Sequence, residues 1–458
     1  MDATTLRSIN PATGEEIATY PVHTSSEVDR YLAQTDEAQR LWRTSTFDDR
    51  ATILRAAANR LRQQAEDLAV LMATEMGKPI VEGRGEAEKC AWVCEYYANN
   101  GPAMLEDAAR PSDLDAAWTV YRPMGTVLAV MPWNFPLWQV FRFAAPALMA
   151  GNAGVLKHAS SVSGSALAIE TILVDAGLDE GLFRTLLLPS SRVADVIGDD
   201  RIAAVTLTGS EPAGRAVAQQ AGQRLKPTVL ELGGSDPYIV LADADVESAA
   251  ATCAASRLTN SGQSCIAAKR FIVEAGVYDD FRSAFAERLR DAVVGDPLDE
   301  RTTVGPQAKV ELRDELHDQV TRTVESGAEI VFGGESPEGP GAFYPVTLLD
   351  GVGPGMAAFD EELFGPVAPL IRADDEEHAI ALANDSSYGL GGAVFTQDVD
   401  RGRRIAADLV ETGSCFVNAK VASDPRLPFG GIKNSGYGRE LSELGIRSFV
   451  NAKTVAVA

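Results

Sequence analysis

Cysteine is scarce in this sequence, and long apolar runs are missing. The 458 residues include five cysteines, an odd and scattered set that does not fit a disulfide framework: Cys90, Cys94, Cys253, Cys265 and Cys415. No apolar run approaches the roughly 20 residues that span a bilayer, and the opening residues contain no apolar signal core. We therefore expect a soluble, cytoplasmic protein without a membrane partner.

Basic residues and histidine are also few. Lysine and arginine total 41 against 65 aspartate and glutamate residues, and the formal net charge of −24 disfavours nucleic acid as a partner. Cys90 and Cys94 lie four positions apart without a second Cys or His pair, so no metal site is expected. A thiol hydrolase with a Cys–His pair stays an alternative, but the histidines lie in no recognisable hydrolase context: His23, His158, His317 and His378.

Strand and helix patterns alternate along most of the chain. The apolar spacing over 46–100 is helical. A first strand–helix series is expected over 126–131, 154–157, 163–174, 202–208, 212–221 and 228–232. After Gly234 a second series starts with a strand over 237–241 and a helix over 246–258, and it continues to about residue 418. Such repeats predict an α/β fold with a parallel, doubly wound sheet that binds ligands at the carboxyl ends of its strands.

Two further strands belong to neither series. Residues 118–121 alternate in polarity, and residues 449–457 form a terminal strand with little left in the sequence to pair with. Together they would make an edge that another subunit completes, although an ordinary edge within one chain is nearly as consistent with the pattern.

One cysteine stands in a context suited to nucleophilic chemistry. Cys265 follows a small polar stretch, 260–264, that includes a glycine, and Glu231 ends an apolar strand directly before Leu232 and two glycines. A nucleophilic thiol needs an exposed turn and a nearby proton acceptor, which these two segments supply. The alternatives are a buried inert thiol and a solvated strand end.

Other turns at strand ends carry groups for binding. Asn134 stands between Pro132 and Pro136 after a buried strand, in a stiff turn that suits an oxyanion donor or is merely rigid. A glycine-rich turn between a strand and a helix can point its backbone amides at a phosphate. The candidate residues for such a pyrophosphate-binding turn are Thr208, Gly209, Ser210 and Gly214. Lys157 ends another strand, where it would donate to a ribose hydroxyl or simply lie on the surface.

Several segments together resemble the aldehyde dehydrogenase superfamily from about residue 8 to the last strand. They are PWNFP, LTGSEPAG, ELGG, GQSC, EELFGPV and PFGGIKNSGYGREL, in the family's order and spacing. The resemblance implies three parts that assemble into a homodimer or homotetramer. These are a Rossmann-type dinucleotide-binding domain (1–108 and 124–233), an α/β catalytic domain (234–433) and a small β oligomerisation element (109–123 and 446–458).

The resemblance also assigns roles by motif. Cys265 is similar to the thiol that forms a thiohemiacetal and then a thioester, with Asn134 and the Cys265 amide as the oxyanion hole and Glu231 as the base for hydrolysis. The residues implied at the cofactor are Trp133, Lys157, Ser160, Thr208, Gly209, Ser210, Gly214, Leu232, Glu362 and Phe364. Many NAD-specific relatives carry a glutamate where this chain has Ser160. Its absence removes repulsion of a 2′-phosphate, so we expect NADP to be accepted and preferred, with NAD as the alternative.

The substrate assignment follows from similarity to bacterial succinate-semialdehyde dehydrogenases. Trp138 and Arg142 lie one helical turn apart, so both are expected at an entrance tunnel where the arginine clamps a distal carboxylate. Ser264 and Ser423 complete the expected substrate contacts. Where animal mitochondrial relatives have a second arginine, this chain has Thr259, which leaves other short semialdehydes or neutral aldehydes as alternatives. A catalytically silent binding protein is the alternative of a different class.

Overall fold

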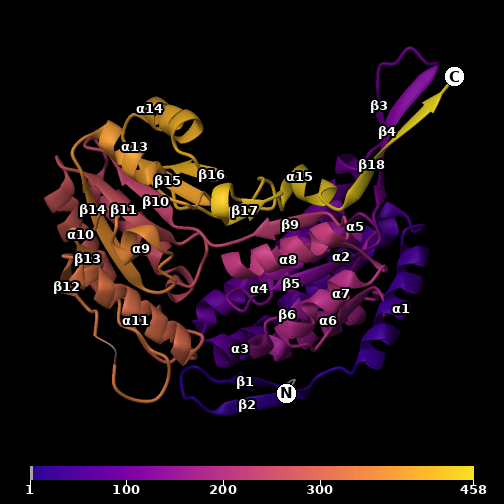
Figure 1. Ribbon diagram of the computed structural model, residues 1–458, viewed down its shortest axis with the longest axis horizontal. Coiled ribbons are helices and arrows are strands. Elements are labelled where there is room, and N and C mark those ends of the chain that lie inside the picture. Colours follow the sequence, from indigo (N-terminus) through magenta and orange to yellow (C-terminus); the bar gives the residue numbers. More distant parts are fainter. Residues whose placement is uncertain (1–3, 336) are drawn as a thin grey trace.

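The computed structural model describes residues 4–335 and 337–458. Two α/β lobes, each built around its own sheet, lie side by side, and a small third sheet projects from one of them (Figure 1). Within the described residues, no helix has both the length and the apolar character needed to cross a membrane.

The first lobe contains a six-stranded sheet in the order β17-β9-β8-β5-β6-β7. Its strands are parallel except β17, which pairs antiparallel with β9. The bounds are β5 (Thr126–Met131), β6 (Ala153–His158), β7 (Phe183–Thr185), β8 (Ile202–Thr208), β9 (Thr228–Glu231) and β17 (Gly436–Tyr437). The doubly wound arrangement predicted from strand and helix alternation is therefore present.

Alternate side chains of these strands enter two different cores. In β5, Val127 and Ala129 face one apolar cluster, whereas Leu128 faces the other, as the two-residue period of a strand requires. The first cluster is covered by α2 (Phe47–Gln63), α3 (Ala65–Met76), α4 (Ile80–Met104), α5 (Trp138–Met149) and α6 (Ser163–Asp175). The second is covered by α1 (Ser25–Trp42), α7 (Val193–Gly198) and α8 (Glu211–Gln223).

The stretch over 46–100, predicted to be helical, forms the three separate helices α2, α3 and α4. The second ends at Gly77, which has a left-handed backbone with φ of 79°, and a Cβ there would lie 2.7 Å from the Pro306 ring. Pro79 then precedes α4, where a missing N–H costs nothing. These breaks let α4 run across the lobe toward the second sheet (Figure 1).

The second lobe is built on a seven-stranded sheet in the order β12-β13-β14-β11-β10-β15-β16. Its strands are β10 (Asp236–Val240), β11 (Ala268–Glu274), β12 (Glu329–Phe332), β13 (Thr347–Asp350), β14 (Val367–Ala373), β15 (Gly391–Phe395) and β16 (Ser414–Val417). Both faces are buried here too. One is covered by α9 (Val246–Arg257) and α10 (Tyr278–Arg290), and the other by α11 (Val310–Glu325), α12 (Ala357–Asp360) and α13 (Glu376–Asn384). α14 (Val399–Arg404) lies beside β16.

A three-stranded antiparallel sheet projects from the first lobe. It consists of β3 (Ala108–Ala109), β4 (Ala116–Pro123) and the terminal strand β18 (Val450–Val457), which follows α15 (Ser442–Arg447). The two strands that belonged to neither sequence series thus pair with each other, from Val450 opposite Pro123 to Val457 opposite Ala116. The hairpin of β1 (Thr5–Ile9) and β2 (Glu16–Pro21) was not predicted.

The expected domain boundary at 233/234 falls between β9 and β10, which are strands of different sheets. β17 returns to the first sheet from near the end of the chain, a crossing that the expected ranges did not include. We propose that the division between the cofactor domain and the catalytic domain lies at this boundary.

Candidate active site

Cys265 lies in a tightly held connection that follows α9 and leads into the amino end of β11. Asn260, Ser261 and Gly262 all have left-handed backbones, with φ of 54°, 58° and 76°. A Cβ on Gly262 would lie 2.2 Å from the Gly365 carbonyl oxygen, so only glycine fits. Such a run persists only when its surroundings hold it.

Hydrogen bonds from both lobes hold this connection. Asn260 Nδ2 donates to the carbonyl oxygens of Asn134 at 2.7 Å and of Gln263 at 3.0 Å. The Asn260 backbone N–H donates to Glu82 on α4, and the Gly305 N–H donates to Ser261 Oγ at 2.8 Å. The polar residues before the cysteine therefore fix the position of the loop.

Two cavities meet at Cys265. One, of about 280 Å³, is lined by seven of the predicted cofactor residues: Trp133, Thr208, Gly209, Ser210, Leu232, Glu362 and Phe364. The other, of about 210 Å³, is lined by the four predicted substrate residues Trp138, Arg142, Ser264 and Ser423. Because Cys265 lines both cavities, its thiol lies between two binding spaces.

Burial raises the pKa of the Cys265 thiol to about 11, and the nearby cations of Lys269 and Arg142 oppose this shift. Lys269 Nζ donates to the carbonyl oxygens of Ser264 at 2.9 Å and Cys265 at 2.7 Å. It also forms an ion pair with Glu362 at 3.2 Å. At neutral pH the resting thiol is therefore protonated, and the cations beside it favour the thiolate once its proton leaves.

Asn134 lies beside the cysteine loop, as an oxyanion donor must. It is 4% exposed, and its Nδ2 donates to the Gln263 carbonyl oxygen at 3.0 Å. Its Oδ1 accepts from Gln139 Nε2 at 3.0 Å, which fixes the orientation of the amide. An amide nitrogen carries two hydrogens, so the second one is left for a ligand oxygen in the cofactor-side cavity that Asn134 lines.

Glu231 has a different placement from the one its motif suggests. Its carboxylate lies against Gly430, because a Cβ on that glycine would approach Oε1 to 2.6 Å. Neither carboxylate oxygen has a hydrogen-bond partner among the described residues, and Glu231 lines neither cavity. Burial, and then the charge of Glu440, raise the pKa of Glu231. The structure thus brings Cys265 and Asn134 together but keeps this carboxylate in a neighbouring buried cluster.

Arg142 belongs to the same buried cluster. On α5, it forms an ion pair with Glu440, donates from Nη2 to Thr208 Oγ1 at 3.1 Å and lies 4.6 Å from the Phe429 ring centroid. Its side chain lines the substrate-side cavity, as expected, but its charge already has a buried partner. The role of Arg142 as a carboxylate clamp stays a prediction.

The cofactor-side residues differ in how closely they match their expected roles. The rings of Trp133 and Phe364 pack edge to face, with their centroids 5.7 Å apart. The turn from Thr208 to Ser210 leads into α8, and Ser210 is the N-cap of that helix. Leu232 lines the same cavity. Gly214 lies under Leu232, whose Cδ2 would be 2.5 Å from an added Cβ, so this glycine serves helix packing.

Lys157 lies near the carboxyl end of β6, and Ser160 begins the short 3-10 helix that follows this strand. Lys157 is buried, and burial together with the neighbouring Lys309 cation lowers its pKa. An anion bound near these two ammonium groups would relieve the repulsion between them. Lys309 was not identified from the sequence because it lies outside the motif segments.

Two other residues were missed. Lys89 on α4 donates from Nζ to Ser423 Oγ at 2.8 Å and lies 4.3 Å from the Trp138 ring centroid. Glu440 lies within the segment PFGGIKNSGYGREL, and no role was predicted for it. The acidic partner of Arg142 follows only from the folded chain, since the two residues are far apart in sequence.

Known proteins resemble the whole chain. Succinate-semialdehyde dehydrogenase (NADP+) of Mycobacterium avium is 49% identical over 98% of this chain and 96% of its own length. Succinate semialdehyde dehydrogenase (NAD(P)+) Sad of Escherichia coli is 48% identical over 99% and 98%. A succinic semialdehyde dehydrogenase from Streptococcus pyogenes, solved with NADP+ as the cofactor, is 39% identical, with a TM-score of 0.96 and 99% of each chain covered.

The family comparison covers nearly every residue. A model described as the aldehyde dehydrogenase family matches residues 1–455, which includes both lobes and most of the projecting sheet. The chain therefore belongs to the aldehyde dehydrogenase family.

Proposed function

We propose that this protein oxidises succinate semialdehyde to succinate with NADP+, through a covalent intermediate on Cys265. As a family member it is an NAD(P)-dependent aldehyde dehydrogenase. The observation that carries the proposal is the position of Cys265 between two cavities, one lined by cofactor candidates and the other by substrate candidates. The relatives that match the full chain and are named for this reaction support the substrate.

The residues at the junction account for the first half of the reaction. The Cys265 thiol releases its proton to water, and the sulfur attacks the aldehyde carbon. The C=O π bond breaks as the C–S bond forms, which gives a thiohemiacetal whose oxygen carries the negative charge. The second Asn134 amide hydrogen and the Cys265 N–H stabilise the developing oxyanion. Bound nicotinamide supplies the acceptor for the hydride that leaves this carbon, so the intermediate on Cys265 becomes a thioester.

Hydrolysis then completes the reaction. We assign Glu231 as the base that takes a proton from water while the water oxygen attacks the thioester carbon. The C–S bond breaks, the carboxylic acid leaves, and the proton held by Glu231 passes to the sulfur, which restores the thiol. Because its carboxylate lies in the buried cluster with Glu440, Glu231 acts after its side chain turns toward the cavity. Burial and the Glu440 charge raise the pKa of Glu231 in the resting position, so turning toward the cavity would also favour the ionised carboxylate that acts as a base.

The chain's own groups fit a dinucleotide with a 2′-phosphate. Gly209 and Ser210 line the cofactor-side cavity together with the Trp133–Phe364 pair. Lys157 and Lys309 provide two neighbouring cations, and Ser160 brings no negative charge beside them. This charge arrangement supports NADP as the preferred cofactor.

Steady-state kinetics test the proposal. We expect succinate semialdehyde to exceed butanal, a neutral aldehyde of equal chain length, by about tenfold or more in kcat/KM, because a hydrogen bond to a charged group contributes about 1.5–3 kcal/mol. NADP+ should exceed NAD+, and Cys265→Ala should abolish cofactor reduction. Equal efficiency with the two aldehydes would reject the substrate assignment.

We also propose that the protein is a homodimer or homotetramer in the cytoplasm. The projecting sheet exposes β18, in which Val455 is 37% and Val457 50% exposed, and a second copy would cover this surface. The cytoplasm would keep the Cys265 thiol reduced, as attack on an aldehyde requires.

A further inference from the structure

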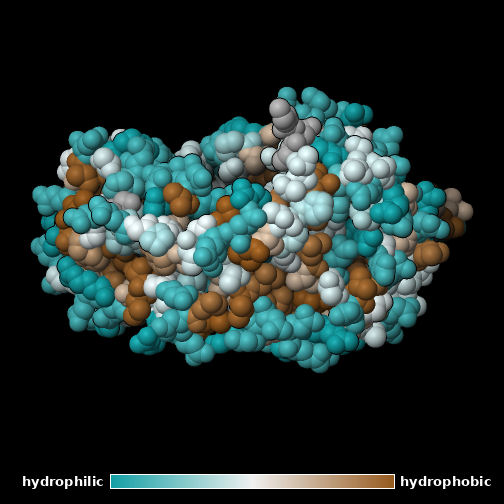
Figure 2. Space-filling model, turned by 90° about the horizontal axis from the view of Figure 1, so that it is seen from below, coloured by the Kyte–Doolittle hydropathy of each residue, from teal (hydrophilic) through white to brown (hydrophobic). Residues whose placement is uncertain are grey.

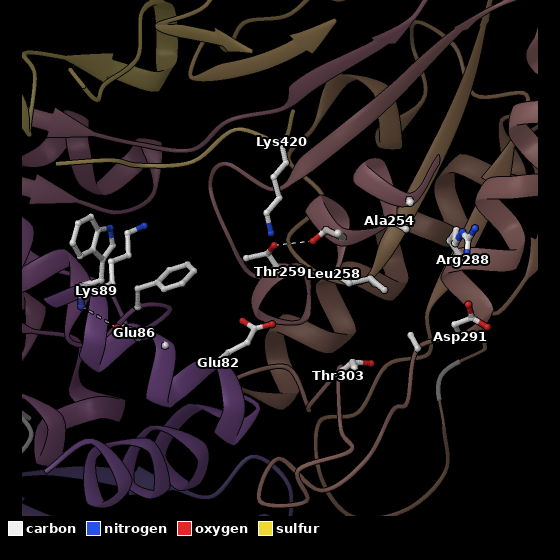
Figure 3. A pocket seen from close by; sticks show the side chains of 16 residues that line it. Glu82, Glu86, Lys89, Ala254, Leu258, Thr259, Arg288, Asp291, Thr303 and Lys420 are labelled. Carbon is white, nitrogen blue, oxygen red and sulfur yellow. Dashed lines mark hydrogen bonds between the residues drawn. The ribbon is translucent and has the colours of Figure 1, made fainter. Parts of the chain in front are cut away.

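A larger cavity adjoins the substrate-side cavity. It measures about 620 Å³ and extends from α4 to the region of α9 and α10 (Figure 3). The two cavities share five lining residues, Lys89, Phe135, Trp138, Thr259 and Lys420. An aldehyde that enters through the larger space therefore passes these residues before it reaches Cys265.

The shared residues include two lysines and no acid. In Figure 3, Lys420 extends into the larger cavity from one side, and Lys89 extends from α4 beside an indole ring. Lys420 is exposed, whereas Lys89 is half-buried. Glu82, Glu86 and Asp291 line the rest of the larger cavity, so the positive excess is confined to the shared residues, where two cations favour an anionic molecule over a neutral one.

Glu86 and Asp424 are the carboxylates whose charges act on Lys89, and each is held by other groups. Glu86 accepts the backbone N–H groups of Leu137 and Trp138 and forms an ion pair with Lys78 at 2.8 Å. Asp424 pairs with Arg426. Within residues 4–335 and 337–458, no carboxylate forms an ion pair with Lys89. Its ammonium is instead held by Ser423 and the face of Trp138.

The contrast with Arg142 decides between the two cations. Arg142 lines the same cavity, but its guanidinium is buried in an ion pair with Glu440. Withdrawing it to hold a substrate would leave Glu440 unpaired in the interior, which is strongly destabilising. Lys89 has three ammonium hydrogens and uses one on Ser423, so two are left for an incoming oxygen anion.

We propose that Lys89, positioned by Ser423 and Trp138, binds the distal carboxylate of the aldehyde and sets the selectivity for carboxylated substrates. This inference rests on the proposed function, since it names the group that recognises that substrate class. Lys89 is thereby a specificity-determining residue supplied by α4, a helix of the cofactor lobe, to a cavity that ends at the catalytic loop.

The charge on Lys89 makes this recognition depend on pH. Burial, and then the Arg142 cation, lower the pKa of Lys89 to about 8. The groups that oppose this shift are Cys90, Glu86 and Asp424. Lys89 is therefore charged below about pH 8 and loses its charge above it. The KM for succinate semialdehyde should rise above that pH relative to the KM for butanal.

The test compares Lys89→Met, Lys89→Arg and the unchanged enzyme at saturating NADP+, with both aldehydes. We expect Lys89→Met to lower the kcat/KM ratio of succinate semialdehyde to butanal at least tenfold, mainly through KM. Lys89→Arg should keep most of the ratio and lose the rise in KM above pH 8. As a matched control, Arg403→Met removes one exposed positive charge from α14 and should leave the ratio as it is.

A second measurement covers the case in which Lys89→Met is inactive. Succinate should slow alkylation of Cys265 by iodoacetamide in the unchanged enzyme, and this protection should be lost in Lys89→Met with an unchanged melting temperature. If Lys89→Met keeps both the kcat/KM ratio of the two aldehydes and the protection of Cys265 by succinate, the role of Lys89 is overturned and the proposed function still stands. No preference for succinate semialdehyde in the unchanged enzyme would overturn the proposed function, and this inference with it.

Discussion

At the scale of single residues, local turns place some groups of the site and tertiary packing places others. Cys265 and Asn134 were identified because each occupies a distinctive local turn, and the structure brings them together. Lys89 was missed because it lies in an ordinary stretch of helix and meets Ser423 only through tertiary packing. The expected Arg142 clamp left out Glu440, whose pairing with Arg142 depends on the folded chain.

Alkylation of Cys265 should depend steeply on pH. Iodoacetamide reacts with the thiolate, and burial raises the pKa of this thiol to about 11 in the ligand-free protein. The rate at residue 265 should therefore rise about tenfold per pH unit between pH 7 and 9. Mass spectrometry of the peptide containing Cys265 measures this rate, and Cys265→Ser provides the blank. A rate that levels off below pH 8 would contradict the pKa direction.

At the scale of elements, buried strands were the most predictable part. The strand expected over 202–208 matches β8, and the helix expected over 246–258 matches α9 to within one residue. Apolar side chains on both faces make such strands recognisable. The β1–β2 hairpin was missed because its strands are mostly exposed and carry little apolar pattern. The left-handed run before Cys265 was also unpredicted, since contacts from other segments hold it.

Gly262→Ala should damage the catalytic connection. The added Cβ would lie 2.2 Å from the Gly365 carbonyl oxygen, at a φ of +76° that alanine rarely adopts. We expect a loss of about 1–3 kcal/mol in stability and a larger loss in kcat, because the Cys265 sulfur shifts. Calorimetry and steady-state assays measure both. Gly222→Ala on α8, where an added Cβ meets nothing within 4 Å, is the control. Wild-type values for Gly262→Ala would refute this explanation of the loop.

At the scale of the whole molecule, surface chemistry and shape bear on assembly. Figure 2 shows hydrophilic side chains over much of one face, with apolar side chains gathered between them. The acidic excess that disfavoured nucleic acid is consistent with this surface. The three-stranded sheet projects from the first lobe in Figure 1, and its strand β18 is mostly exposed. A second copy of the chain would cover this strand, which is why oligomer formation is proposed.

The double variant Val455→Asp and Val457→Asp should dissociate the oligomer. Two carboxylates on β18 would have to be buried against a second copy, at a cost of several kcal/mol. Light scattering coupled to size exclusion should give a dimer or tetramer for the unchanged protein and a smaller species for the variant. Val399→Asp, on exposed α14, is the matched control. A monomeric unchanged protein would contradict the proposed assembly.

The central claim is that the aldehyde is oxidised while bound to the Cys265 sulfur. The most direct measurement mixes enzyme, NADP+ and succinate semialdehyde, quenches the mixture in acid within the first turnover, and analyses the Cys265 peptide by mass spectrometry. The account predicts a succinyl thioester on that peptide, which appears together with a burst of NADPH and is lost as succinate forms. NADPH formation with no acyl group on Cys265 at any time would contradict it.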